Sequence, residues 1–336
     1  MESVNHVFLV IGVPLAAKIG IIGYRNHAGV LLNLLEENSD CNVTTIYHPS
    51  KSIKDARGTN NLSDIYECEA VVIASPNHTH FEYIQKLIKN FDGYIFCEKP
   101  PVTSLNELKD LENIPDKKKL KIFFNFNFRF SKLSDNFKKQ INSKNIGLII
   151  HIDIISSHGL AFKNSYPNSW RADGKKNLHN ILDTVAIHYL DLINFHLEEF
   201  DKSFYFPSLI SGNGTSFDTC YLVLKYSNGM TISILNSYAT PSIDEILIVG
   251  TEGFFSIRNN QLEVHSPRGT FDSRGFFIPP PISYKENFLL QNDYNDSLKK
   301  SLNFFISHVF ENKDFDIQYF NKSLSTNKLI LDLKNS

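Results

Sequence analysis

The sequence predicts an α/β unit with a parallel sheet, followed by an α+β unit whose mostly antiparallel sheet is covered by helices. Short apolar runs alternate with helix-like segments from residue 18 to about residue 125. Beyond about residue 130 the strand-like runs become longer and come in succession. The chain has 336 residues, which exceeds the length at which one hydrophobic core usually keeps growing. Two domains are therefore expected.

The first unit, residues 18–127, contains five strand candidates separated by amphipathic segments. The strands are predicted at residues 18–22, 42–47, 70–74, 93–97 and 120–124, and two of the helices at residues 28–37 and 81–90. Strands that alternate with helices build parallel βαβ units. This pattern predicts an N-terminal Rossmann-type parallel sheet.

The second unit, residues 128–336, has a different pattern. Its strands are predicted at residues 146–156, 217–226, 230–238 and 245–249, and its helices at residues 178–197, 287–310 and 321–333. The turn signals at residues 227–229 and 250–253 favour antiparallel hairpins. A C-terminal, mostly antiparallel sheet domain covered by helices follows.

Composition narrows the classes of partner. The formal net charge is −2, and neither sign gathers in long runs, which argues against a nucleic-acid or polybasic membrane surface. The four cysteines are isolated and lack CxxC spacing. They predict reduced thiols in a cytoplasmic protein, without a disulfide framework or a zinc site. The expected partner is a small molecule.

Residues 1–17 form an N-terminal extension that is apolar from residue 7 onward. A signal peptide is the alternative, but no basic region precedes the apolar run, and Pro14 interrupts it. The run is also too short to cross a bilayer as a helix. An extension or an additional strand on the first domain is favoured.

The turn after the first strand reads G-Y-R-N-H-A-G, the context of a pyrophosphate-binding turn. In the pattern G-x-G-x-x-G, Gly23 is the first glycine, Arg25 replaces the second and Ala28 is the tolerated third. Arg25 must either swing its side chain away or pair with phosphate. Gly23, Arg25, Asn26 and His27 are the predicted binding residues. A plain strand–turn–helix is the alternative.

The second strand ends at Y-H-P-S-K, where NAD-binding proteins usually place an acid for the ribose 2′-hydroxyl. No carboxylate is present here. The hydroxyl of Ser50 and the cation of Lys51 suit a 2′-phosphate better, so NADP(H) is predicted over NAD(H). The alternative is that both residues begin a solvated loop.

Two further strand ends carry motifs, S-P-N-H-T-H after the third strand and C-E-K-P-P after the fourth. In order, spacing and strand placement these motifs and the turn resemble the glucose-fructose oxidoreductase and inositol dehydrogenase (Gfo/Idh/MocA) family, over nearly the whole chain from residue 18. E-K-P is the most specific element. The resemblance implies that Lys99 lies by the nicotinamide and the substrate hydroxyl, with a cis Lys99–Pro100 bond. The cofactor-binding residues expected here are Ser75, Pro76, Asn77, His80, Glu98 and Lys99.

More matches lie downstream. N-F-R-F at residues 127–130 resembles the family's crossover into the second domain, and Trp170-Arg171 resembles the W-R pair before its catalytic helix. That helix contains H-Y-L-D at residues 188–191, similar to the family's H-x-x-D ending. Substrate contacts are expected from Arg129, Trp170, Arg171, Thr184 and Asp191. Interdomain packing or surface ion pairs are the alternative.

The predicted helix at residues 178–197 has a polar stripe beside its apolar one. Asn180, Thr184, His188 and Asp191 fall within a stripe roughly 80° wide, which is either an active-site face or a solvated face. Thr184 stands where the family usually has an aspartate. Asp183 lies roughly 140° from His188 around the helix and cannot simply replace it. Either Thr184 or Asp191 could orient the His188 ring.

The resemblance implies an NAD(P)-dependent dehydrogenase or reductase that acts on a sugar, cyclitol or nucleotide sugar. For hydride transfer at a secondary alcohol, Lys99 and His188 are the catalytic candidates for moving the hydroxyl proton. A non-catalytic NAD(P)-binding regulatory or scaffold protein is the alternative, favoured by Thr184 and Arg25. A transport or storage protein would leave the E-K-P motif unexplained. The resemblance also implies a homo-oligomer, a dimer or tetramer.

Overall fold

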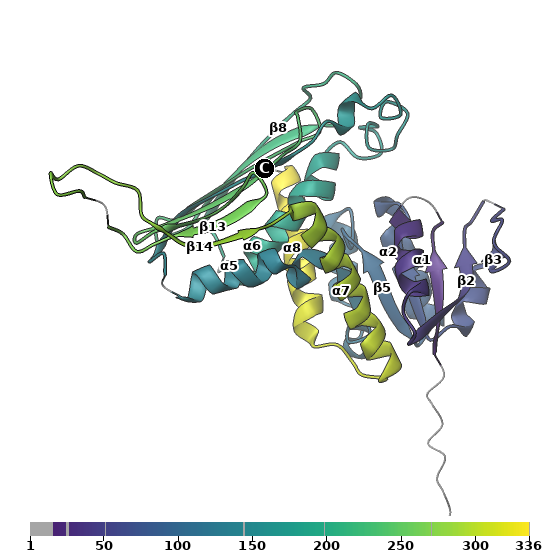
Figure 1. Cartoon of the computed structure of the whole chain (residues 1–336). Coiled ribbons are helices and arrows are strands. Elements are labelled where there is room, and N and C mark those ends of the chain that lie inside the picture. The colour runs from purple at the N-terminus through teal and green to yellow at the C-terminus, as the bar shows by residue number, and fades with distance from the viewer. Residues whose placement is uncertain are drawn as a thin grey trace, which may run out of the picture.

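The computed structural model describes residues 16–24, 27–50, 52–143, 145–197, 199–269 and 271–335 (Figure 1). Most of the predicted N-terminal extension and three predicted cofactor residues, Arg25, Asn26 and Lys51, lie outside the described residues. Two sheets form the frame of the molecule, and helices fill the space between and around them (Figure 1). This arrangement confirms the predicted fold class.

The first sheet is parallel throughout, and its six strands follow the order β3-β2-β1-β4-β5-β6. Its central strands are buried, because helices cover both faces of such a sheet. All five predicted strands are present within two residues of their predicted ends. The strands are β1 (Ala17–Ile22), β2 (Cys41–Tyr47), β3 (Gly58–Thr59), β4 (Ala70–Ile73), β5 (Tyr94–Glu98) and β6 (Ile122–Asn125). The helices of this unit are α1 (His27–Glu36), α2 (His80–Asn90), α3 (Leu105–Glu112) and α4 (Asp116–Lys119).

The second sheet has eight strands in the order β14-β13-β12-β11-β7-β10-β9-β8. Every neighbouring pair is antiparallel except β7 and β10, which are parallel. The two predicted hairpin turns join β9 to β10 and β11 to β12. The strands are β7 (Ile149–Ser157), β8 (Lys202–Ser208), β9 (Thr219–Lys225), β10 (Thr231–Ser237), β11 (Ile243–Gly250), β12 (Phe254–Arg258), β13 (Gln261–His265) and β14 (Ile282–Asn287).

Four helices of the second unit pack between the two sheets (Figure 1). They are α5 (Lys132–Ser143), α6 (Ile187–His196), α7 (Leu290–Phe310) and α8 (Ile317–Asn335). The predicted helix at residues 178–197 is divided, because a π-helical turn, Leu182–Ala186, leads into α6. Single π turns inside helices often mark functional sites.

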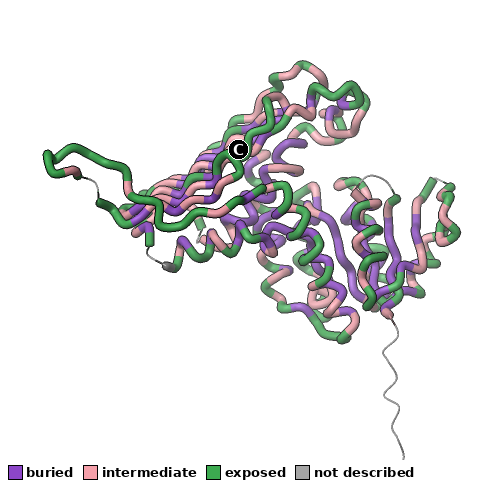
Figure 2. Tube along the Cα trace, viewed as in Figure 1, coloured by how far each residue is buried: buried purple, intermediate pink, exposed green. Residues whose placement is uncertain are grey.

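The core joins the two units. Helix α7 contacts α1, β1 and β6, and its Leu298, Leu302 and Phe305 share one apolar cluster with strands of the first sheet. Phe305 lies 5.3 Å from Phe96 between ring centroids. In Figure 2 the buried residues run continuously from the first sheet through the helices to one face of the second sheet, while the other face is more exposed. The C-terminal helices therefore stabilise the N-terminal sheet.

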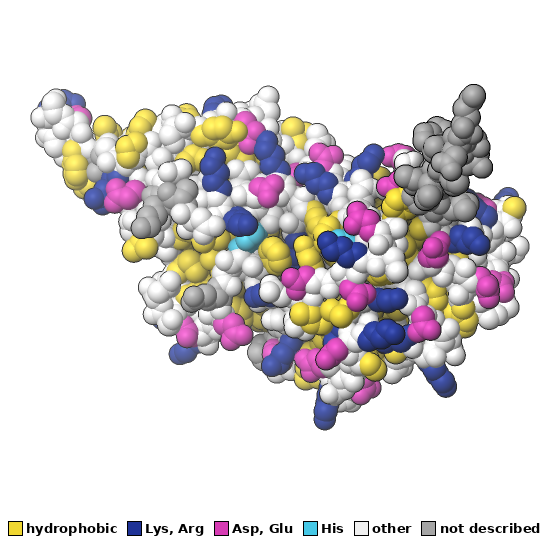
Figure 3. Space-filling view, turned by 90° about the horizontal axis from the view of Figure 1, so that it is seen from below, with side chains coloured by type: hydrophobic (Ala, Val, Ile, Leu, Met, Phe, Trp, Pro, Cys, Tyr) yellow, Lys and Arg dark blue, Asp and Glu magenta, His cyan; other side chains and the backbone are white. Residues whose placement is uncertain are grey.

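The surface agrees with the balanced composition. Figure 3 shows acidic and basic side chains interspersed on the face that it presents. No helix in the described ranges is both long and apolar enough to cross a membrane. The same residues contain no group of three or more His, Cys, Asp or Glu side chains arranged to hold a metal ion. All four cysteines are buried and unpaired.

Candidate active site

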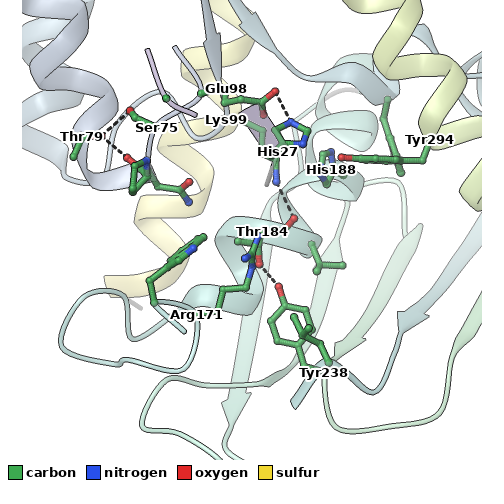
Figure 4. Close-up of a pocket in the computed structure, with 18 of the residues that line it drawn as sticks. His27, Ser75, Thr79, Glu98, Lys99, Arg171, Thr184, His188, Tyr238 and Tyr294 are labelled. Atoms are coloured by element: carbon green, nitrogen blue, oxygen red, sulfur yellow. Dashed lines mark hydrogen bonds and ion pairs between the residues drawn. The ribbon is translucent and has the colours of Figure 1, made fainter. Parts of the chain in front are cut away.

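A cavity of about 930 Å³ opens at the carboxyl ends of the first sheet's strands and extends to the second unit (Figure 4). Its volume lies at the upper end of the range for ligand sites. In open α/β sheets, ligands bind at this edge, where neighbouring connections diverge. The predicted site residues that line it are Gly23, His27, Ser75, Pro76, Asn77, Glu98, Lys99, Trp170, Arg171, Thr184 and His188.

The turn after β1 fits a dinucleotide. Gly23 has a φ of 122°, and a Cβ there would come 2.7 Å from the carbonyl oxygen of Ala74. Gly23 lines the cavity, and glycine is required there because the turn packs directly on the backbone that follows β4. The buried Nδ2 of Asn77 has no hydrogen-bond partner among the described residues. An unused amide donor beside this turn is suited to a phosphate or ribose oxygen.

Glu98 anchors the start of α1. Its Oε1 accepts a hydrogen bond from Asn125 Nδ2 at 2.7 Å and lies 2.9 Å from His27 Nε2. Burial alone would raise the pKa of Glu98, but His27, Asn125 and Lys99 outweigh it and lower the pKa to about 2. The charge of Glu98 in turn raises the pKa of His27. Glu98 and His27 thus form an ion pair at this end of the cavity, in which the imidazolium of His27 balances the carboxylate of Glu98.

Lys99 reaches across to the second unit. Its Nζ donates a 2.9 Å hydrogen bond to the backbone carbonyl of Thr184, and its bond to Pro100 is cis, as the resemblance implied. Burial lowers the pKa of Lys99 to about 8, with a further contribution from the positive charge of Arg171, while Glu98 opposes the shift. An amine with this pKa can both release and accept a proton near neutral pH.

His188 lies near Lys99 on the other wall of the cavity (Figure 4). Its ring is 4.9 Å from the Phe128 ring and 5.9 Å from the Tyr294 ring, between centroids. Burial and the nearby charge of Lys99 lower its pKa well below the ordinary value, so the imidazole is neutral. Its buried Nδ1 has no partner in the described part of the chain. A neutral ring with a free nitrogen can exchange a proton with a ligand.

The expectation that Thr184 or Asp191 orients His188 is wrong. The Thr184 hydroxyl donates to the carbonyl of Asn180 at 2.6 Å and bonds to the Tyr238 hydroxyl. Asp191 accepts two hydrogen bonds from Arg129. The π-helical turn and the fold around it give Thr184 and Asp191 other partners. The ring of His188 is therefore held by its aromatic contacts.

The expected substrate contacts of Arg129 and Asp191 are also corrected. Arg129 Nε and Nη2 lie 2.8 and 2.6 Å from the two carboxylate oxygens of Asp191, and their side chains are 2% and 1% exposed. Thr326 also donates to Asp191. Neither charged group lines the cavity. This ion pair joins the crossover after β6 to α6, so it positions the site rather than forming it.

Two residues expected to bind cofactor lie off the cavity wall. His80 is fully buried, and its ring nitrogens lie 2.8 and 2.9 Å from the carbonyls of Pro100 and Ser75. It therefore ties the motifs after β4 and β5 together. Ser50 is exposed, and His48 and Pro49 line the cavity in its place.

Asp183 points away from His188, as its position on the helix predicts. It is 1% exposed, and Lys334 and Asn177 both donate to it. The sequence reasoning missed other lining residues, notably Tyr238, His158 and Tyr294. The only available signal was position, since the first two follow strands and the third lies near the start of α7.

Two family models match the chain. The model of an oxidoreductase family with an NAD-binding Rossmann fold matches residues 17–126, and the GFO/IDH/MocA C-terminal domain matches residues 135–256. Together they match most of the first unit and the part of the second unit up to residue 256. The chain therefore belongs to the Gfo/Idh/MocA family of NAD(P)-dependent oxidoreductases.

Individual relatives are distant. Glucose-6-phosphate 3-dehydrogenase of Bacillus subtilis is 24% identical over 191 residues, which cover 54% of each chain. The chain thus spans about half the length of that relative. Inositol 2-dehydrogenase of Rhizobium meliloti is 22% identical over 263 residues, 74% of this chain and 77% of that one. An oxidoreductase from Agrobacterium radiobacter, crystallised with NAD⁺, L-tartaric acid and magnesium, superposes with a TM-score of 0.74 at 16% identity, covering 95% and 96% of the two chains. At this identity the likeness shows the fold.

Proposed function

We propose that this protein transfers a hydride between the nicotinamide of NAD(P) and a secondary alcohol or ketone of a sugar, cyclitol or nucleotide sugar. One observation carries the proposal: Lys99, with a pKa of about 8, and the neutral His188 line the same cavity as the Gly23 turn. The names of the relatives, which include a sugar phosphate dehydrogenase and an inositol dehydrogenase, support the substrate class.

The roles of the residues follow from their environments. When bound, the nicotinamide supplies the hydride acceptor or donor. Gly23 and Asn77 hold the dinucleotide at one end of the cavity. In the direction of oxidation, the neutral amine of Lys99 accepts the hydroxyl proton, and His188 is the second group able to hold it. In the reverse direction, the ammonium of Lys99 polarises the ketone and returns the proton. The hydrogen bond to the Thr184 carbonyl fixes the position of the amine.

The test is a panel of sugars and cyclitols with NAD(P), followed by nicotinamide absorbance. We expect turnover by the wild-type chain and a loss of at least about 100-fold in kcat for Lys99→Ala, with nucleotide binding mostly intact. Lys328→Ala, which removes an exposed lysine, is the matched control. Unchanged turnover in Lys99→Ala would reject its role.

A second candidate function is a cofactor-binding regulatory or scaffold protein. The observation in its favour is Thr184, which stands where the family usually has an aspartate and so adds no carboxylate to the site. Its hydroxyl hydrogen-bonds to Asn180 and Tyr238. The same panel separates the two functions, because a scaffold would bind the nucleotide and turn over no substrate.

We also propose NADP(H) as the preferred cofactor. The cavity wall at the end of β2 consists of His48 and Pro49, with no carboxylate among the described residues there to bind a ribose 2′-hydroxyl. Titration of the protein with NADPH and NADH tests this preference. Equal or tighter binding of NADH would reject it.

A homo-oligomer completes the proposal. The face of the second sheet opposite the helices exposes a group of large apolar side chains, which water disfavours. This open face includes Phe204, Phe206, Tyr221 and Leu247, which are 48%, 56%, 42% and 36% exposed. A second copy of the chain is the occupant that the proposed dimer or tetramer would place there.

A further inference from the structure

Arg171 differs from the other arginines that the structure describes. Each of those pairs with an aspartate or glutamate: Arg57, Arg129, Arg258, Arg268 and Arg274. Arg171 lines the cavity and has no such partner among the described residues. Its guanidinium carbon lies 4.6 Å from the centroid of the Trp170 ring, and its charge opposes the rise that burial causes in the pKa of the Tyr238 hydroxyl. The group is thus held in place without being neutralised.

Neither carboxylate of the cavity balances this charge. Glu98 is occupied by His27 and Asn125 at the opposite end. Asp244 is exposed at the rim, where it accepts a 2.7 Å hydrogen bond from Ser156. The charge of Arg171 instead acts on the ligand space, where it lowers the pKa values of Lys99 and His158. Two cations that share a cavity favour an anionic ligand.

Arg171 lies on the second unit's side of the cavity, and its charge reaches His27 in the dinucleotide turn. Figure 4 shows Arg171 and Tyr238 on the opposite side of Thr184 from His27 and Glu98. Tyr238 bonds to Thr184, whose carbonyl accepts from Lys99. Thr184 thus contacts both Tyr238 and the amine that would act on the substrate, and the charge of Arg171 lowers the pKa of that amine. An anion bound to Arg171 would therefore lie close to that amine.

We propose that the substrate carries an oxyanion, a carboxylate or a phosphate, that Arg171 binds while Lys99 faces the reacting hydroxyl. This inference rests on the proposed function and narrows its substrate class to sugar acids or sugar phosphates. A guanidinium presents parallel N–H groups that match two oxygens of either anion. The Trp170 ring fixes its plane, and the Tyr238 hydroxyl and His158 ring add polar groups beside it.

The experiment compares matched substrates with the full chain and saturating nucleotide. The pairs are glucuronate with glucose, galacturonate with galactose, and glucose 6-phosphate with glucose; the first two pairs test carboxylates and the third a phosphate. We expect kcat/KM to be at least about tenfold higher for an anionic member. Equal or higher values for the neutral sugars would overturn the inference and leave the proposed function standing.

Variants of Arg171 tie the preference to this side chain. Arg171→Gln is expected to lower kcat/KM for the anionic substrate by about 100-fold, mainly through KM, with much less change for its neutral partner. Arg171→Lys should keep part of the preference, since it retains the charge. Arg274→Gln, at an exposed ion pair, is the control. An equal loss on both members of a pair would argue against anion binding.

A binding measurement covers the case in which no sugar is turned over. The nucleotide-loaded protein is titrated with glucuronate, glucose 6-phosphate and glucose by calorimetry, and each titration is repeated with Arg171→Gln. Binding of an anion that the variant loses supports the inference even though the proposed function has failed. Absence of anion binding to the wild-type chain overturns it.

Discussion

Two side chains from different units acquire unusual protonation states because the cavity removes them from water. Lys99 is held by a carbonyl oxygen, which cannot neutralise it, and Arg171 adds a second positive charge. His188 lies between aromatic rings. Desolvation disfavours the charged form of both groups, so a titratable amine faces a neutral imidazole. This combination is suited to moving one proton in either direction.

The pH dependence of the reaction follows from Lys99. Its pKa of about 8 means that the neutral amine accumulates above that pH. We expect kcat/KM for oxidation to rise with pH and level off above about 8, and that for reduction to fall over the same range. Initial rates in both directions measure this. In Arg171→Gln the inflection should move to higher pH, because a cation that lowers the pKa is gone. A flat profile would argue against Lys99 as the proton carrier.

Gly23→Ala tests the dinucleotide turn. The added Cβ would lie 2.7 Å from a backbone oxygen at a φ of 122°, so the turn must move. We expect a loss of about 1–3 kcal/mol in stability together with weaker nucleotide binding. Urea unfolding and nucleotide titration measure the two effects. Gly29→Ala is the control, since its Cβ would meet nothing within 4 Å on α1 and should stabilise the helix.

At the level of helices and strands, burial patterns explain which predictions succeeded. The strands of the first sheet are short apolar runs that alternate with amphipathic helices, so their positions could be predicted from local sequence alone. Strands β8, β12, β13 and β14 were not predicted, because they are short and only partly buried and so contain no long apolar run. Of these, β8 and β14 are the edges of the second sheet. Periodicity also cannot distinguish a π turn from an α-helix, so the division at residues 182–186 was missed.

The candidate site shows the same limit. Motifs at strand ends located the residues of the first unit, because the topology of a parallel sheet brings those ends together. Residues such as Tyr238 and His158 reach the cavity through the packing of the second sheet, which leaves no local pattern. Arg129 and Asp191 matched family motifs but form an ion pair with each other. A motif does not reveal which partners its residues have in the folded chain.

The buried pair between the crossover and α6 gives a prediction at this scale. Arg129→Ala should lower the free energy of unfolding by about 3–5 kcal/mol, because it leaves Asp191 charged, buried and unpaired. The double variant Arg129→Met/Asp191→Leu should recover much of the loss. Urea unfolding measures both. As control, Arg258→Ala breaks an exposed pair with Glu245 and should cost less than about 1 kcal/mol. Similar losses at the two arginines would contradict the buried role.

For the whole molecule, the proposed homo-oligomer would form through the open face of the second sheet. Phe206 and Tyr221 are cross-strand neighbours with stacked rings, 6.3 Å between centroids. Phe206→Asp would place a charge at this apolar contact, so we expect the oligomer to dissociate to monomers in analytical ultracentrifugation. Leu105→Asp, at an exposed position on α3, should leave the sedimentation coefficient unchanged. A wild-type chain that is already monomeric would refute the proposed association.

Helix α7 has a further consequence for ligand exchange. It packs on β1 and β6 through buried leucine and phenylalanine side chains, and Tyr294 near its beginning forms part of the cavity wall beside His188. A large apolar contact of this kind resists hinge motion. We therefore expect α7 to hold the two walls of the cavity at a fixed spacing. Ligands would then enter and leave through an opening of nearly constant width.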